Sequence, residues 1–182
     1  MDLGIVFYYI FEENFANGCG ACLITNNIMN AWENNISVDT LYDIAIDNIN
    51  LLGCEVIHVS DFMCRMARMN DAPELYISQL KEAMSNVPMH IVTNDYNMYG
   101  ASLVFFNKNI CKQLAKNYDD DLYIMPASIH ETIIVPVSSA ENTKDIKDLV
   151  KSANKNDVRP EDLLSDSVYM YSRETAKISI VA

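Results

Sequence analysis

Residues 123–136 have the sequence YIMPASIHETIIVP, and this stretch decides the fold that the sequence predicts. A β-rich run ends at Pro126, small residues follow, and a second β-rich run closes at Pro136. Proline has no backbone N–H for a sheet ladder, so both prolines favour strand ends or a sheet edge. The stretch therefore predicts two strands joined by a turn, with the polar residues between the prolines within reach of solvent.

The polar residues of this turn include the only histidine–glutamate pair of the chain, His130 and Glu131. If residues 128–132 are extended, the two-residue period of a strand places Ser128, His130 and Thr132 on one face and Glu131 on the other. The pattern then separates the imidazole from the neighbouring carboxylate.

The composition is that of an acidic chain with enough apolar residues for a core. The 182 residues are 50% hydrophobic and carry a formal net charge of −12. We expect a single globular domain over residues 1–182. Negative charge repels phosphate backbones and anionic lipid surfaces, so we expect neither nucleic acid nor a membrane as a partner. Five cysteines, an odd number, favour a reducing cytoplasm over a disulfide framework.

Outside residues 123–136, strand-like runs occur in hairpin-like pairs with helical patterns between them. Further strands are predicted at residues 3–11, 21–25, 55–59, 89–94, 99–106, 167–173 and 177–181. Helices are predicted from a Ser37 cap to Gly53, at residues 61–68, 73–86 and 110–118, and from a cap at Asn142 or Thr143 to about residue 153. Residues 95–97 would form a turn, and Gly100 indicates a bulge or a close backbone approach. The pattern predicts an α+β fold with a mainly antiparallel or mixed sheet flanked by about four helices.

Several apparent metal motifs are incomplete. A metalloprotease helix needs a second histidine one turn after His130 and Glu131, but Ile134 occupies that position. Cys19 and Cys22 form a lone CxxC, which is at best half of a zinc site. We therefore predict no metal and no cofactor.

Two histidines and three methionines are interpreted as structural. His58 and His90 lie next to apolar strand residues, which is typical of satisfied core or edge histidines. The methionines at positions 63, 66 and 69 recur at helical spacing and are expected to fill gaps in the core.

The candidate catalytic residues are Ser128, His130 and Glu131. Such a site would use His130 as general base, with Ser128 or Glu131 assisting and Asp166 as a possible orienting carboxylate. A candidate ligand-binding set near the C-terminus comprises Tyr169, Tyr171, Arg173 and Asp166. Its members Tyr169, Tyr171 and Arg173 would form a polar pocket with Ser128 and His130 if the two strands are neighbours.

Four segments carry a resemblance to a known family: DLGIVFYYIF at residues 2–11, TNDYNMYGASLVFF at 93–106, LYIMPASIHETIIVP at 122–136 and DLLSDSVYMYSRE at 162–174. The chain resembles, over nearly its whole length, a family of bacterial proteins widespread in gut Firmicutes and known as a domain of unknown function. In that family the segment similar to residues 2–10 lies well inside the chain, behind a helical region. The resemblance implies the C-terminal domain of a longer protein, and it implies no catalytic residue.

Three functional hypotheses follow. The first is a cytoplasmic binding or interaction domain that meets a protein or small-molecule partner through a polar surface around His130. The second is a hydrolase or transferase in which His130 is the general base, so whether the chain is an enzyme stays open. In the third, residues 126–131 are purely structural and fix the entry of the second strand.

Overall fold

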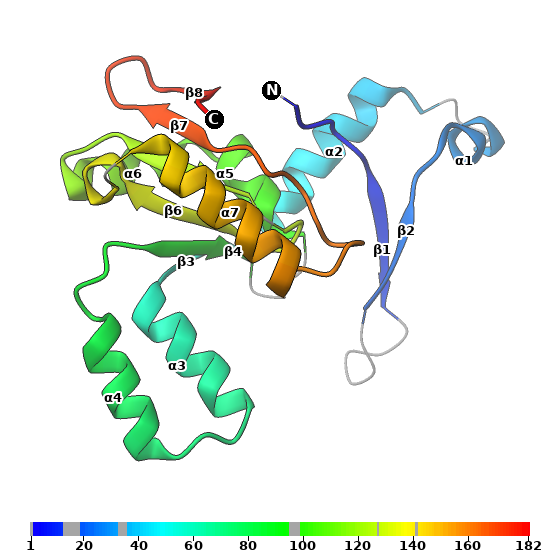
Figure 1. Ribbon diagram of the computed structural model, residues 1–182. Coiled ribbons are helices and arrows are strands. Elements are labelled where there is room, and N and C mark those ends of the chain that lie inside the picture. Colours follow the sequence, from blue (N-terminus) through cyan, green and yellow to red (C-terminus); the bar gives the residue numbers. More distant parts are fainter. Residues whose placement is uncertain (1, 13–18, 33–35, 95–98, 127, 141) are drawn as a thin grey trace. The chain divides into compact units, whose positions relative to one another are not determined.

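The structure is a computed structural model that describes residues 2–12, 19–32, 36–94, 99–126, 128–140 and 142–182 (Figure 1). These residues form two compact units, of which the smaller is Leu3–Leu51 and the larger is Asp2 together with Leu52–Ala182. Helices and antiparallel sheets make up both units, which confirms the α+β class. The expectation of a single domain over residues 1–182 stays a prediction.

The smaller unit is a β-hairpin followed by two helices. Strand β1 (Tyr8–Glu12) pairs antiparallel with β2 (Cys19–Leu23), and α1 (Asn26–Ala31) and α2 (Val38–Leu51) follow. The hairpin and the longer helix were both predicted, although the first strand begins at Tyr8 rather than at residue 3. Ser37 caps α2, because its hydroxyl accepts a hydrogen bond from the Thr40 N–H at 3.0 Å.

The larger unit is built on a six-stranded sheet in which every neighbouring pair is antiparallel. Its strands are β3 (Glu55–His58), β4 (His90–Thr93), β5 (Leu122–Met125), β6 (Thr132–Pro136), β7 (Tyr169–Ser172) and β8 (Lys177–Ile180). Their order in space is β3-β4-β6-β5-β7-β8 (Figure 1). The two strands predicted from residues 123–136 therefore lie at the centre of the sheet.

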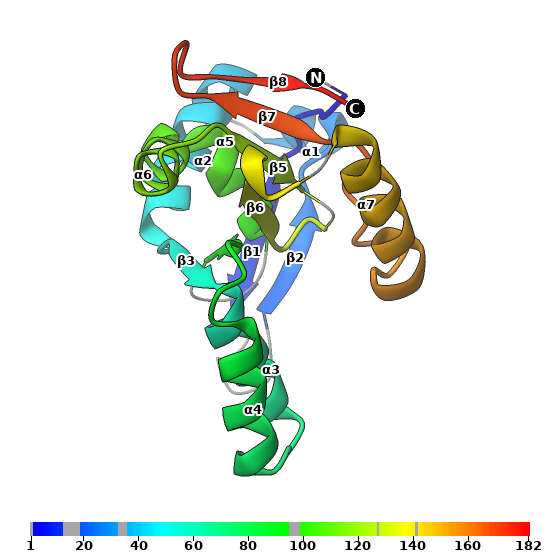
Figure 2. The same cartoon turned by 60° about the vertical axis from the view of Figure 1, so that its left-hand side comes forward.

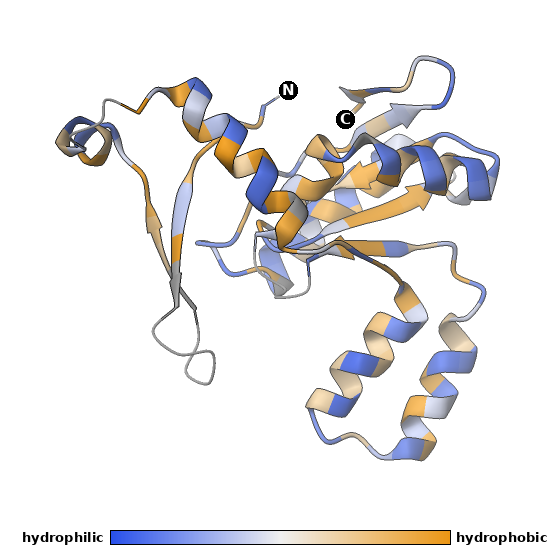
Figure 3. Ribbon diagram, turned by 180° about the vertical axis from the view of Figure 1, so that it is seen from behind, coloured by the Kyte–Doolittle hydropathy of each residue, from blue (hydrophilic) through white to orange (hydrophobic). Residues whose placement is uncertain are grey.

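Helices cover both faces of this sheet (Figure 2). On one face, Tyr123, Met125 and Val135 pack in one cluster with Val150 of helix α7 (Thr143–Asp157). On the other face, Phe105 of helix α5 (Leu103–Phe106) makes an edge contact with the ring of Tyr169. Because both faces of the central strands are buried, these strands are almost continuously apolar, as Figure 3 shows by their colour.

The predicted strand at residues 99–106 is wrong. Residues Gly100–Ser102 form a 3-10 turn, η1, which continues into α5 and is followed by α6 (Lys108–Tyr118). Strand β4 already has β3 and β6 as neighbours, so it has no free edge with which this segment could pair as a hairpin. The turn predicted at residues 95–97 lies outside the described residues.

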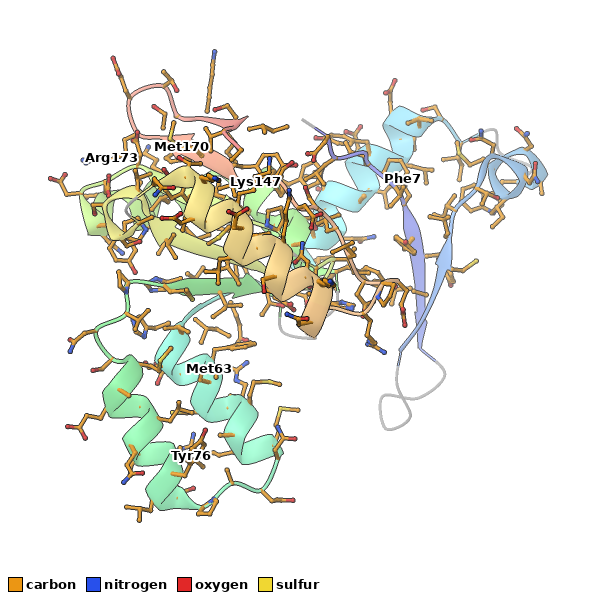
Figure 4. All side chains as sticks on the ribbon, viewed as in Figure 1. Phe7, Met63, Tyr76, Lys147, Met170 and Arg173 are labelled. Carbon is orange, nitrogen blue, oxygen red and sulfur yellow. The ribbon has the colours of Figure 1, made fainter. Side chains whose placement is uncertain are left out.

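Helices α3 (Val59–Met69) and α4 (Glu74–Met84) form an arm that extends from the sheet between β3 and β4 (Figure 1). The expectation that the methionines of this segment fill the core is wrong, because Met63 and Met66 are exposed and Met69 is 73% exposed. Figure 4 shows Met63 and Tyr76 on this arm. Helix α3 contacts mainly α4, so its remaining apolar side chains have no layer of the fold to pack against.

The helices of the described part are all too short, or too polar, to cross a membrane.

After β6, a short 3-10 turn, η2 (Val137–Ser139), leads towards α7. The cap of α7 is Asn142, one of the two predicted cap residues, and its side-chain oxygen accepts a hydrogen bond from the Asp145 N–H at 2.9 Å.

The carboxylate of Asp2 ties the start of the chain to the strand β7 region. It accepts hydrogen bonds from the hydroxyls of Ser165, Ser167 and Tyr169. The Tyr169 hydrogen bond is the largest of the effects that lower the pKa of Asp2 to about 2. The carboxylate in turn contributes, after burial, to raising the pKa of Tyr169 to about 12.

The Asp2 contacts predict a pH-dependent contribution to stability. A carboxyl group whose pKa is lowered by folding stabilises the native state above its unfolded pKa, and this stabilisation is lost as the pH falls towards the folded pKa. The variant Asp2→Asn should therefore melt at a lower temperature than wild type at pH 7, and the difference should shrink between pH 4 and pH 2. Thermal unfolding followed by circular dichroism over this range measures it.

The matched control is Asp43→Asn, which neutralises an exposed carboxylate of α2. Its melting temperature should follow that of wild type at every pH. A difference between Asp2→Asn and wild type that stays constant from pH 7 to pH 2 would contradict a role for the Asp2 charge.

Candidate functional site

The segment between β5 and β6 is a turn rather than a continuation of the strand. Strand β6 begins at Thr132, and Ser128 joins the sheet region only through an isolated bridge to Leu163. The alternation that would separate His130 from Glu131 requires residues 128–132 to be extended, and this condition is not met before Thr132. Ala127 lies outside the described residues. The turn stands at the end of the sheet where β4 and β5 finish and β6 starts.

The hydroxyl of Ser128 closes this turn. Its oxygen accepts hydrogen bonds from the backbone N–H groups of His130, at 3.1 Å, and Glu131, at 3.3 Å. The same hydroxyl donates to Glu131 Oε1 at 2.7 Å. Serine hydroxyls commonly satisfy the backbone of a tight turn in this way, because the strand ladder does not reach these N–H groups. Ser128 is only 3% exposed, so a substrate does not reach its oxygen in this conformation.

The imidazole of His130 is held at both of its nitrogens. The backbone N–H of Tyr99 donates to Nδ1 at 3.3 Å, and Nε2 lies 3.2 Å from Oδ1 of Asp162. A nitrogen that accepts from an N–H carries no proton, so the neutral ring carries its proton on Nε2 and donates it to Asp162. The side chain of His130 is 23% exposed, which places it at the rim of the fold rather than inside it.

Asp162 joins His130 to an exposed arginine. Its Oδ2 accepts from Nε of Arg159 at 3.0 Å, while Oδ1 faces the imidazole. The carboxylate is 15% exposed and the Arg159 side chain is 75% exposed. The backbone of Asp162 is fixed as well, because its carbonyl accepts from the Ile129 N–H at 2.9 Å. The Asp162 carboxylate thus links the imidazole of His130 to the solvent-exposed guanidinium of Arg159.

Gly100 brings a second backbone segment against His130. A Cβ atom at this position would lie 2.6 Å from the His130 carbonyl oxygen and 2.8 Å from both Asn94 N and Thr93 Cα. The hydroxyl of Thr93 donates to the same carbonyl oxygen at 3.0 Å. Tyr99, the residue before this glycine, has a φ of 56° and directs its N–H at the imidazole. The close backbone approach predicted at Gly100 is confirmed.

The C-terminal candidate residues are not gathered around His130. Tyr169 and Tyr171 are buried, and Asp166 accepts a hydrogen bond from the side chain of Asn154 at 2.7 Å. Burial, followed by the nearby Cys111, raises the pKa of Tyr171. The pKa of Cys111 is itself raised to about 12 by burial. These tyrosines therefore belong to the interior of the sheet.

Arg173 lies at the opposite end of β5 from His130. Its guanidinium is 2.6 Å from Asp119 Oδ1, and its backbone N–H donates to Asp121 just before β5. The His130 turn follows the other end of that strand, after Met125. A site that combines Arg173 with His130 would have to span the length of the strand.

Three residues of the His130 surroundings were absent from the sequence-based candidates: Tyr99, Arg159 and Asp162. Tyr99 and Asp162 lie inside two of the segments that carry the family resemblance, and that is the one signal that points to them. Their contacts with His130 join segments far apart in the chain, which no local pattern reveals. Among the described residues, no group of three side chains with metal-ligand chemistry lies together.

The surroundings of Gly100 predict a strong effect of a single methyl group. Gly100→Ala should lower the free energy of unfolding by about 1–3 kcal/mol, because all three clashing atoms belong to backbone and cannot rotate away. Gly4→Ala is the control, since a Cβ at Gly4 would meet nothing within 4 Å. Urea unfolding of both variants measures the difference. Equal stability of Gly100→Ala and Gly4→Ala would contradict the contact with His130.

The comparisons with known proteins give a match to one family model. No curated protein and no solved structure matches the chain. Residues 1–173 match a family of unknown function, DUF5688. The match extends over all of the described residues that surround His130. The chain belongs to this family of unknown function.

Proposed function

We propose that the chain is a binding or interaction domain whose recognition surface is the polar edge around His130. The observation that carries the proposal is that both ring nitrogens of His130 already have hydrogen-bond partners. A general base needs an unoccupied lone pair within reach of the proton it removes. An imidazole bonded at both nitrogens serves instead to fix the groups around it, which suits a preformed binding surface.

Arg159 is the residue that this surface offers to a partner. The Asp162 carboxylate holds its Nε, and three quarters of the side chain remains accessible. The planar guanidinium fork matches a carboxylate better than an ammonium group does. The partner we propose is therefore an acidic group on a protein or small molecule. We do not propose nucleic acid, because the chain carries a net charge of −12.

We place this binding domain in the cytoplasm. Among the residues whose side chains the structure describes, Cys22, Cys64 and Cys111 form no disulfide, which supports a reducing compartment. The predicted role of Asp166, Tyr169, Tyr171 and Arg173 in ligand binding stays a prediction, and the proposed surface does not require it.

Two alternatives stay open. The carboxylate–imidazole contact between Asp162 and His130 is of the kind that orients a catalytic histidine, and it favours a hydrolase or transferase that uses His130 as base. That reaction would need the Tyr99–His130 hydrogen bond to break and Ser128 or Glu131 to become accessible. In the structural alternative, the bonds of Ser128 to the turn are the whole role of residues 126–131.

The binding proposal predicts that a carboxylate is recognised at Arg159. Titration of the ¹⁵N-labelled chain with N-acetylglycine should shift the amide signals of Tyr99 and Asp162, and N-acetylglycinamide should not. Arg159→Ala should weaken the interaction about tenfold or more, since hydrogen bonds to charged groups contribute about 1.5–3 kcal/mol. Arg173→Ala is the control, because it removes an arginine that also pairs with an aspartate, at the far end of β5.

Three results bear against the proposal. Binding that is equally weakened by Arg159→Ala and Arg173→Ala would indicate nonspecific attraction of anions, and the absence of any shift would remove the carboxylate ligand. Covalent labelling of Ser128 by a fluorophosphonate probe would favour the hydrolase.

A further inference from the structure

Two histidines face each other where the α3–α4 arm joins the sheet. His58 is the last residue of β3, His90 is the first residue of β4, and the two are partners in the strand register. Their ring centroids are 5.3 Å apart, with the ring planes at 88°. The whole arm is inserted between these two residues, so the pair closes its base.

His58 also caps the first helix of the arm. Its Nδ1 accepts a hydrogen bond from the Ser60 N–H at 3.2 Å and lies 2.8 Å from the Ser60 hydroxyl. A capping residue has to supply a lone pair to the free N–H groups of the first turn. A protonated imidazole has no lone pair, and its charge is unfavourable at the positive N-terminus of a helix.

His90 is held neutral by its surroundings. Its Nδ1 lies 2.7 Å from the hydroxyl of Tyr118 on α6, and the two rings meet edge to face. Burial, followed by the nearby charge of His58, lowers the pKa of His90. On the β6 side its register partner is the apolar Ile134. Burial raises the pKa of the Tyr118 hydroxyl above a value at which it is already neutral near pH 7.

The charged groups near the joint come from both helices of the arm. Asp61 of α3 lies close enough to His58 for the imidazole to contribute to lowering the pKa of that carboxyl, after the larger effect of Lys81. Lys81 of α4 is 3.0 Å from Asp61, and Arg68 makes a smaller contribution. The Lys81 ammonium beside Asp61 is a second positive charge near His58, and it offsets part of the attraction between the carboxylate and a protonated His58.

We infer that the His58–His90 pair is a proton-sensitive joint that holds the base of the α3–α4 arm closed when both rings are neutral and loosens it on mild acidification. Protonation of His58 removes the cap of α3 and places a cation beside His90. Imidazoles are the side chains that change charge between about pH 5 and 8. The joint would control how the arm presents its exposed apolar residues, such as Met69 and Leu75. This inference does not depend on the binding site proposed at His130.

The sign of the pH dependence follows from His90. Because folding lowers the pKa of His90, the unfolded chain binds more protons than the folded chain just below the ordinary histidine pKa of about 6.5. The closed joint therefore loses stability as the pH falls through this range. The closed joint is fully stabilising only above this pH range.

Amide hydrogen exchange on the full chain tests the joint. Protection of the first turn of α3, corrected for the intrinsic pH dependence of exchange, should fall about fivefold between pH 7.5 and pH 5.5, the change expected for losing one helix cap. Protection of α6 should stay constant. In His58→Asn, the asparagine keeps a capping oxygen that does not titrate, so α3 should keep its protection at pH 5.5.

Unchanged protection of α3 in the wild type would overturn the inference, and so would an equal loss in wild type and His58→Asn. A second measurement covers the case in which His58→Asn perturbs the arm. In that variant the ring signals of His90 should titrate at a higher pH than in wild type, because the charge of His58 is one of the two causes that lower its pKa. An unchanged His90 titration would show that the rings are not coupled.

Discussion

The burial of β5 and β6 on both faces is the constraint on which the rest of the larger unit depends. Leu122 and Ile124 of β5 and Ile134 of β6 have no exposed surface, and Tyr123, Met125 and Val135 pack beneath α7 on the other side. Strands at such a position have no solvent-facing side on which to place polar residues. Backbone N–H and C=O groups just beyond the ends of these strands must therefore find hydrogen-bond partners outside the strand ladder.

The turn between these strands shows how the chain meets that requirement. Pro126 ends β5 without an unpaired N–H, and the Ser128 hydroxyl receives two of the N–H groups that follow. The carbonyl of His130 accepts from Thr93, and the carbonyl of Ile129 accepts from Ala101 N–H at 3.3 Å. Asp162 then fixes the imidazole from the opposite side. The sequence PASIHE resembles a catalytic triplet, but Ser128 and Glu131 bond to each other within the turn, whereas the imidazole of His130 is held by Tyr99 and Asp162.

Local patterns predicted the strands and most of the helices, because each depends on residues close in the chain. The proline-bounded runs at residues 122–136, the Ser37 and Asn142 caps and the close approach at Gly100 are examples. The errors have a common cause. Residues 99–106 have the β propensity of a strand, but β4 already has two neighbouring strands, which only the tertiary structure reveals. Met63, Met66 and Met69 have the apolar spacing of a core, but α3 contacts mainly α4, which is likewise a tertiary feature. For the same reason, local patterns did not reveal Asp162 and Arg159 as part of the His130 surroundings.

Strand β4 connects two imidazole environments of different kinds. At its start, His90 faces a second histidine and a tyrosine hydroxyl, so protonation is opposed. Beyond its end, His130 sits between an N–H donor and a carboxylate, an arrangement that fixes one tautomer. The His58–His90 pair thus lies where the α3–α4 arm begins, and His130 lies at the polar edge of the sheet.

The protonation pattern of the His130 ring tests this account most directly. A long-range ¹H–¹⁵N correlation spectrum of the full chain at pH 7.5 distinguishes the two neutral tautomers by their ring nitrogen shifts. The account predicts a proton on Nε2 and a bare Nδ1, because Tyr99 donates to Nδ1 and Asp162 accepts from Nε2. A proton on Nδ1 would mean that the Tyr99 contact does not exist, and it would contradict the preformed edge around His130.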